Sequence, residues 1–252
     1  MKSPRAIVGG VGLILMIGVF VWAVTGLHAF GKENSRYGYY TAHHAVPQRE
    51  ATNSVVVVAF DYRGFDTLGE EFILFISVVG VVALLRRTRD EQEEEPAHDL
   101  GREQQLTSDA TRWLGSALVG PMTIVAAYVI THGQLTPGGG FPGGVILMAA
   151  IALIFLGGEW LVLVRVRKSS TWIELLESAG AAGFALIGFG GLIAMGAFFK
   201  NFLPYGTSGS LLSGGTIPLA NVAVGLEVAG ATLMVVSELL DQRMLRSKRE
   251  GG

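Results

Sequence analysis

The sequence contains no cysteine, and only 16% of its 252 residues are charged. The absence of cysteine excludes a disulfide framework, a thiolate metal site and a cysteine nucleophile. The basic residues form no stripe of the kind that binds nucleic acid, and the net charge of -2 sums over charges that are segregated along the chain. No nucleophile–base pattern or metal-ligand spacing is present, so the sequence does not indicate an enzyme active site.

Hydrophobic residues make up 50% of the chain, and the mean hydropathy is +0.46. The 35 glycines fit a protein whose helices pack through small side chains. Six apolar runs are each about long enough to cross a bilayer as a helix. These runs are Ala6–Leu27, Thr67–Leu85, Ala110–Thr131, Val145–Val164, Leu175–Phe199 and Ile217–Leu240. The sequence therefore predicts an all-α, polytopic integral membrane protein with about six transmembrane helices.

The distribution of lysine and arginine predicts the orientation of these helices in the membrane. With the N-terminus in the cytoplasm, 14 of the 19 basic residues fall on the inner side. We therefore expect both termini to be cytoplasmic. The first apolar run follows Lys2 and Arg5, as a signal peptide would. It is longer than a usual signal h-region and five further runs follow, so we expect it to remain as a helix.

The segments between the runs suggest a division of the chain. An acidic, polar segment at residues 90–109 is typical of a solvated linker. It separates a two-helix part, residues 1–89, from a four-helix part, residues 110–252. On the outer side, His28–Asn53 is polar and is expected to be poorly ordered. The β-branched run Ser54–Phe60 fits either an interfacial strand or an extension of the second helix.

A glycine-rich reversal, His132–Gly144, joins the third and fourth apolar runs. Five of the seven residues from Gly138 onward are glycine, which permits close backbone approach and positive φ. Two prolines in the segment fix φ and lack an N–H donor. Irregular backbone near membrane depth persists only where protein or water satisfies its polar groups. The reversal is therefore expected to be a packing or pathway element.

The same segment matches a nucleotide-binding pattern without the required context. Gly138, Gly140 and Gly143 satisfy G-x-G-x-x-G, but a transmembrane run precedes them instead of a strand, which excludes a dinucleotide site. The Gly140 and Gly144 spacing is instead that of helix packing. His132, at the outer mouth, can relay protons or be a simple surface group.

Carboxylates at membrane depth are the second candidate feature, because they often mark ion or proton paths. Asp66 can cap the second membrane helix, and Glu70 lies about one turn inside it, near the positive end of the helix dipole. The alternative is an ordinary helix start with its carboxylates among the headgroups. Glu227 lies ten residues into the last run, about 15 Å by helix rise. It fits either an ion path or a paired carboxylate that fixes helix contacts.

Three motifs resemble a known family. Leu135–Ile146, preceded by His132-Gly133, resembles the signature of the B subunit (MnhB- or MrpB-like) of Mrp-type multisubunit Na+/H+ antiporters. Thr216–Val228 is similar to the last-helix motif of that subunit. Pro142 departs from the pattern, which would have glutamine there. Asp61–Glu70 is similar to the C-terminal end of the large A subunit, and the same piece is a small separate chain in membrane-bound hydrogenase-type complexes.

The resemblance implies a membrane subunit, without its own active site, of an antiporter that exchanges Na+ for H+ across the cell (plasma or inner) membrane. It implies other membrane subunits as partners, Na+ and H+ as transported ions, and no cofactor in this chain. The alternative is the ion-translocating module of a respiratory hydrogenase- or sulfur reductase-type complex. The glutamate of the family's Thr-Leu-Gly-Glu motif is implicated in ion transport and matches Glu70, whereas Glu71 has no such match.

Two sets of candidate residues follow from the motifs and the resemblance together. The ion-path candidates are Glu70, Asp66, Glu227 and His132. The candidates for an assembly or packing loop are Thr136, Pro137, Gly138, Gly139, Gly140, Phe141, Gly143 and Gly144.

Overall fold

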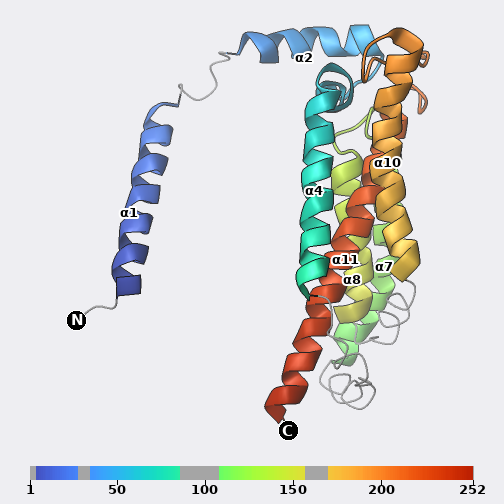
Figure 1. Ribbon diagram of the computed structural model, residues 1–252. Helices are drawn as coiled ribbons and strands as arrows, with labels where there is room; N and C mark the ends of the chain where they lie inside the picture. The colour runs from blue at the N-terminus through green and yellow to red at the C-terminus, as the bar shows by residue number, and fades with distance from the viewer. Residues whose placement is uncertain (1–3, 28–34, 86–107, 157–169, 252) are drawn as a thin grey trace. The chain divides into compact units, whose positions relative to one another are not determined.

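The computed structural model describes residues 4–27, 35–85, 108–156 and 170–251, and every regular element within them is helical (Figure 1). The predicted all-α class is therefore confirmed. The elements are α1 (Pro4–Thr25), α2 (Arg36–Arg49), α3 (Ser54–Val57), the π-helical turn η1 (Val58–Tyr62), α4 (Gly64–Leu85), α7 (Asp109–Thr131), α8 (Gly140–Leu156), α10 (Ser170–Met195) and α11 (Ile217–Gly251).

The chain forms two units, Met1–Thr41 and Ala42–Gly252. The first unit contains α1, in which the span Val8–Thr25 is long and apolar enough to cross a bilayer. Pro4 is the first residue of this helix. Proline suits this position because the N–H of a first helical residue makes no hydrogen bond within the helix. None of this span is buried within the described part of the chain. The apolar surface of α1 is thus suited to a lipid environment.

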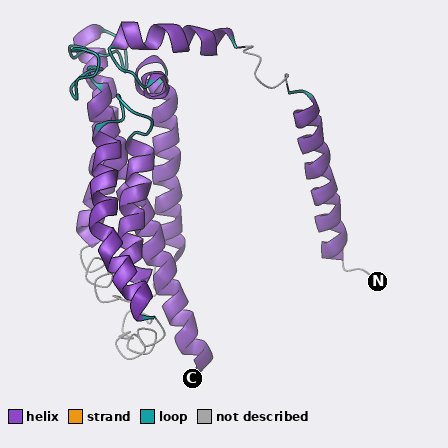
Figure 2. Ribbon diagram, turned by 180° about the vertical axis from the view of Figure 1, so that it is seen from behind, coloured by secondary structure: helices purple, strands orange, loops and turns teal. Residues whose placement is uncertain are grey.

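The second unit is a bundle of α4, α7, α8, α10 and α11 (Figures 1 and 2). Helices α4, α8 and α11 run in one direction, and α7 and α10 run in the opposite one. The loops 50–53, 132–139 and 196–216 consequently meet at one end of the bundle, where hydrogen bonds join them. The acidic segment at residues 90–109 lies almost entirely outside the described residues, and the predicted division there stays a prediction.

Within the described residues, five helices are long and apolar enough to cross a membrane, and the shorter apolar helix Gly140–Ile154 adds a sixth apolar element. The predicted fourth run, Val145–Val164, continues beyond Leu156, where the described residues stop. Its helix also begins earlier than expected, inside the glycine-rich reversal at Gly140. The reversal therefore comprises residues 132–139, and the remaining motif glycines belong to the first turn of α8.

The segment before α4 is helical, which decides between the two alternatives for Ser54–Phe60. Helix α3 runs into the π-helical turn η1, where the Arg63 N–H donates to the Val58 carbonyl at 2.9 Å. The Thr67 hydroxyl donates to the Ala59 carbonyl at 2.7 Å and so satisfies an acceptor at this irregular turn. Helix α4 begins at Gly64, so Asp66 lies in its first turn and pairs with Arg63 instead of capping a later start.

The polar outer segment also contains regular structure that the sequence pattern did not predict. Within His28–Asn53, residues Arg36–Arg49 form α2, although Pro47 lies inside that helix. Pro47 lies two residues before the helix ends at Arg49, and the N–H that it lacks removes one hydrogen bond from the end of the helix. The expectation of a poorly ordered segment was therefore wrong for this part of it.

Helix α11 is the centre of the bundle: 61% of its membrane span is buried, against 22% or less for the other four spans. It contacts α4, α7, α8 and α10. Glycines allow this close approach. A Cβ at Gly144 of α8 would lie 2.8 Å from the Gly225 carbonyl oxygen, and a Cβ at Gly225 would lie 2.9 Å from the Ile130 side chain of α7. Packing of this kind replaces the hydrophobic effect as the attraction between helices in lipid.

We predict that Gly144→Ala destabilises the bundle by about 1–3 kcal/mol, because the added methyl group meets α11 backbone that cannot move alone. Gly80→Ala in α4 is the matched control, since nothing lies within 4 Å of a Cβ at that position. Thermal unfolding of the detergent-solubilised protein, followed by circular dichroism, measures both. Equal melting temperatures for the two variants would contradict the close contact between α8 and α11.

Candidate functional site

The glycine-rich reversal is held by hydrogen bonds to two asparagines from distant parts of the chain. Gly138 and Gly139 have backbone φ angles of 144° and 137°, which residues other than glycine rarely adopt. The Asn221 Oδ1 of α11 accepts the Gly140 N–H at 2.9 Å, and a Cβ at Gly139 would lie 2.9 Å from the same oxygen. Glycine is therefore required here both for the backbone angles and for the room that Asn221 occupies.

Asn53 supplies the second attachment, from the residue that precedes α3. Its Nδ2 donates to the Gly133 carbonyl at 2.7 Å and to the Thr136 carbonyl at 3.0 Å. Its Oδ1 accepts the Val55 N–H at 3.2 Å and so caps α3. One side chain thus begins a helix and satisfies carbonyls of the irregular loop. This contact joins the predicted N-terminal part to the predicted four-helix part.

Gln134, which the sequence motifs did not single out, is completely buried within the same loop. Its Nε2 donates to the Leu211 carbonyl at 2.6 Å and to the Thr131 carbonyl at 3.2 Å. The side chain therefore ties the reversal to the long loop 196–216. One feature of the sequence indicates this role: Gln134 is a long polar residue within a glycine-rich segment. Such a side chain can donate hydrogen bonds to nearby backbone carbonyls.

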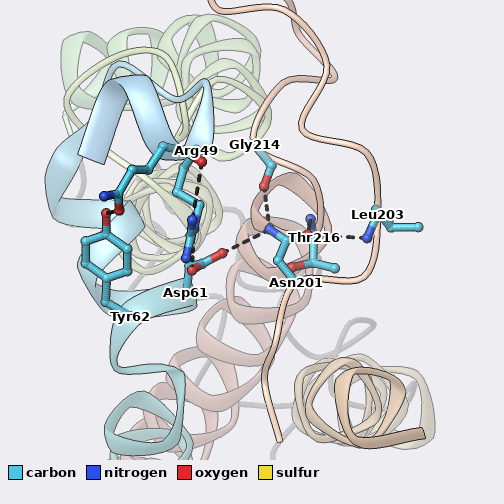
Figure 3. A network of polar contacts seen from close by, with 8 residues as sticks. Arg49, Asp61, Tyr62, Asn201, Leu203, Gly214 and Thr216 are labelled. Atoms are coloured by element: carbon cyan, nitrogen blue, oxygen red, sulfur yellow. Dashed lines mark hydrogen bonds and ion pairs between the residues drawn. The ribbon is translucent and has the colours of Figure 1, made fainter. Parts of the chain in front are cut away.

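A polar network at the same end of the bundle connects α2, η1 and the loop before α11 (Figure 3). The Arg49 Nε donates to the Asp61 Oδ1 at 2.6 Å, and the Asn201 Nδ2 donates to the Asp61 Oδ2 at 3.1 Å. The Asn201 Oδ1 accepts the Thr216 N–H at 3.0 Å, directly before α11. The Asp61 side chain is only 4% exposed, so its charge depends on these donors.

Two tyrosines flank the guanidinium group of this network. The Arg49 Cζ lies 5.1 Å from the centre of the Tyr62 ring and 5.2 Å from that of Tyr205, within cation–π range. Burial acts to lower the pKa of Arg49, but the hydrogen bond and the charge of Asp61 outweigh it and raise the pKa above its ordinary value. Burial and the Asp61 charge together raise the pKa of Tyr205. Both side chains therefore stay protonated at neutral pH.

Three carboxyl groups lie inside the membrane part of the bundle, each on a different helix. Glu227 of α11 is completely buried, Glu177 of α10 is 2% exposed and Glu71 of α4 is 5% exposed. The carboxyl groups of Glu71 and Glu227 interact with each other, and that of Glu177 is within electrostatic range of Glu227. Among the described residues no hydrogen-bond donor reaches either carboxylate oxygen of Glu227.

The other predicted ion-path residues lie elsewhere. Glu70 and Asp66 are exposed on α4, outside the bundle interior. His132 stacks on Tyr128 with ring centroids 4.1 Å apart, at the end of α7. The structure thus groups Glu227 with Glu71 and does not bring it together with Glu70 or His132. Within the described ranges no group of three His, Cys, Asp or Glu residues has an arrangement that holds a metal ion.

A helical pattern could have revealed the buried face of α4. Gly64, Thr67, Glu71 and Val78 are its buried residues, and their spacings of three, four and seven define one helix face. Glu70 falls beside that face because adjacent residues are about 100° apart around a helix. Glu177 offered a weaker signal: it is a single carboxylate in the first turns of an apolar run.

The residues predicted to form an assembly or packing loop also divide into buried and exposed ones. Gly139, Gly140, Gly143 and Gly144 are buried, whereas Pro137 and Phe141 are not. The buried glycines pack inside this chain, against α7 and α11. Phe141, 54% exposed, belongs to the outer surface of α8.

Comparison with known proteins confirms the resemblance carried by the motifs. Residues 111–234 match the family described as a domain related to the MnhB subunit of Na+/H+ antiporter, and residues 6–99 match the family of the MBH E-type subunit, MbhE. An uncharacterised protein of Methanocaldococcus jannaschii is 28% identical to this chain, with 94% of this chain and 97% of that protein aligned.

Two further similarities place the chain among subunits of membrane complexes. The A/B subunit of a probable K(+)/H(+) antiporter of Rhizobium meliloti is 28% identical over 76% of this chain, which spans only 21% of that longer protein. A chain of the membrane-bound sulfane sulfur reductase, an archaeal respiratory membrane complex, superposes with a TM-score of 0.69 and 27% identity, covering 94% of this chain and 98% of its own length. The chain is thus a multi-pass membrane protein related to transporter subunits.

We predict that Arg49 and Asp61 are coupled by about 1.5–3 kcal/mol, the range of hydrogen bonds to charged groups. A double-mutant cycle with Arg49→Gln and Asp61→Asn, read by thermal unfolding in detergent, measures the coupling. Arg63 and Asp66 are the matched control, because their side chains are 59% and 51% exposed. An exposed pair contributes about 0–1 kcal/mol. Equal coupling in the two pairs would show that the network does not depend on burial.

Proposed function

We propose that this chain, which combines an MnhB-related domain with an MbhE-related segment, is a non-enzymatic subunit of a multisubunit cation/proton antiporter. It works only together with other membrane subunits, exchanges Na+ outward for H+ inward in the cell membrane, and needs no cofactor of its own. Relatedness to antiporter subunits over both parts of the chain supports this proposal. The orientation with both termini in the cytoplasm belongs to the same proposal.

The position of Glu70 is the observation that carries the ion-path part of the proposal. It is exposed about 9 Å along α4 from Gly64, by helix rise. Phe65, Ile73 and Ile76 of the same helix are exposed by 70%, 68% and 68%, so the surface around it is suited to lipid or to a protein partner. A carboxylate on such a surface is costly unless it faces a hydrated path or a polar partner. Glu70 therefore lines an ion path at the boundary with a neighbouring subunit.

The glycine-rich reversal has a different role in this proposal. Asn53 donates to its Gly133 and Thr136 carbonyls, and the Gln134 side chain ties it to the Leu211 carbonyl of the long loop. Its glycines are in contact with α7 and α11. It holds the outer end of the bundle in one arrangement, so that α4 presents Glu70 at a fixed place. Phe141 and Pro137, which are not buried within this chain, contribute to the surface that meets the partner subunits.

The alternative is a subunit of a redox-driven respiratory complex, where partner chains carry the redox centres. The near end-to-end match to a chain of the sulfane sulfur reductase complex favours it, because this chain covers 98% of that chain but only 21% of the K(+)/H(+) antiporter's A/B subunit. In that setting the chain would still provide an ion-translocating module, so the two functions differ in the energy source.

We predict that Glu70→Gln in the assembled complex abolishes cation/proton exchange in membrane vesicles while leaving assembly intact. Removal of the charge leaves the shape of the side chain unchanged, so the loss reports the ion path. Asp109→Asn is the control, as Asp109 is an exposed carboxylate in the first turn of α7. Unchanged exchange in Glu70→Gln would refute its role and leave the chain as a scaffold.

Purification of the tagged native chain in mild detergent, with mass spectrometry of the proteins that accompany it, decides between the antiporter and the respiratory complex. We expect antiporter-type membrane subunits alone. Iron–sulfur or nickel–iron subunits in the same preparation would assign the chain to a respiratory complex. Recovery of the intact chain without any partner would contradict both.

A further inference from the structure

The interior carboxyls of Glu71, Glu177 and Glu227 have no part in the ion path proposed at Glu70, which is on the outer surface of α4. They come from three helices, and their exposed fractions are 5%, 2% and 0%. Four of their oxygens meet no hydrogen-bond donor within the described residues: both oxygens of Glu227, the Glu71 Oε2 and the Glu177 Oε1. Such groups need an explanation, because an unpaired carboxylate in a membrane interior is strongly disfavoured.

The packing of α10 on α11 fixes two of these carboxyls in place. A Cβ at Gly180 of α10 would lie 2.7 Å from the Glu227 Cβ, and a Cβ at Gly230 of α11 would lie 3.0 Å from the Glu177 Cβ. Each helix thus places a glycine opposite the glutamate of the other, three residues from its own glutamate. This reciprocal arrangement brings the two side-chain stems to the crossing point of the helices and leaves little room beside them.

No basic group among the described residues neutralises the cluster. Helix α8 contains no acidic or basic residue, and those of α7, Asp109 and Arg112, are in its first turn, about 25 Å by helix rise from the part that packs near Gly143. The other groups that act on the cluster are also carboxyls: Glu70 on Glu71, and Glu174 on Glu177. Two carboxyls that interact directly cannot both carry a charge here, and a hydrogen bond between them requires a proton.

We propose that Glu71 and Glu227 form a proton-holding pair inside this chain, with Glu177 as its third carboxyl. The pair binds one exchangeable proton between two carboxyl groups, which lowers its net charge from -2 to -1 without a basic partner. A proton fits better than a metal cation, because the described carboxyls have no metal-binding arrangement and the crossing of α10 and α11 beside Glu227 leaves little space. The pair rests on the proposed transport function, in which it supplies the proton side of the exchange.

The test uses the complete complex, reconstituted in vesicles, with cation/proton exchange measured as a function of pH. Two carboxyls that share a proton titrate as one coupled unit. We expect Glu227→Gln and Glu71→Gln each to displace the pH of half-maximal exchange by about one unit or more. The double variant should be no worse than the stronger single variant. Asp109→Asn should keep the native profile, since its side chain is exposed in the first turn of α7, away from the cluster.

The same profiles separate this proposal from the one at Glu70. If Glu70→Gln stops exchange but Glu227→Gln retains the native rate and pH profile, the proton pair is wrong and the Glu70 path stands. If Glu227→Gln displaces the profile and Glu70→Gln has no effect, the pair stands and the Glu70 path is wrong. A purely structural role for Glu227 would change the amount of complex without changing its pH profile, and that result would overturn the pair.

Infrared spectroscopy of the wild-type complex provides a measurement that does not depend on how well a variant folds. A protonated carboxyl has a C=O stretching band that shifts in heavy water. We expect this band at the pH at which exchange occurs, and we expect it to weaken in Glu71→Gln. Absence of the band from the wild type at that pH would overturn the proposal. Loss of the band when Na+ is added at constant pH would overturn it in favour of a cation site.

Discussion

Close backbone contact along α11 is the constraint on which the rest of the bundle depends. In lipid, apolar side chains gain little from meeting one another, so helices associate where small residues let their backbones approach. Gly140 and Gly144 of α8 and Gly180 of α10 meet α11 in this way. Because these contacts involve backbone on both sides, they fix the rotation of each helix as well as its distance. The rotation decides which side chains of α10 and α11 point inward.

The loop end of the bundle extends the same constraint to α4. Asn53, which precedes α3, contacts the glycine-rich reversal, and Asp61, which lies within η1, contacts Asn201. Both contacts connect the segment before α4 to loops that belong to the MnhB-related part. As Arg49 also binds Asp61, helix α2 enters the same network. The start of α4 is therefore held by hydrogen bonds and charge at one end and by contact with α10 and α11 along its length.

The sequence was sufficient for the fold class, the apolar spans and the family, because these depend on composition, run length and three motifs. It was insufficient to predict regular structure within polar segments. Helix α2 has little hydrophobic periodicity, and its segment was expected to be poorly ordered. It also favoured Glu70 over Glu71. Two adjacent carboxylates cannot be assigned to inside or outside until the helix rotation is known, and that rotation depends on contacts with α10 and α11 that are distant in sequence.

The adjacent carboxylates Glu70 and Glu71 of α4 lie in two different environments. Glu70 and Glu71 are neighbours in sequence, but about 100° of helix rotation separates them, so one is exposed and the other buried. A change in the charge of Glu70 still acts on Glu71 through space. If a cation passes the outer face of α4, its charge is felt by the interior pair without any movement of the helix. A rigid bundle, held by glycine contacts and by the network at its loop end, is suited to transmit such an effect because its carboxyls stay at fixed separations.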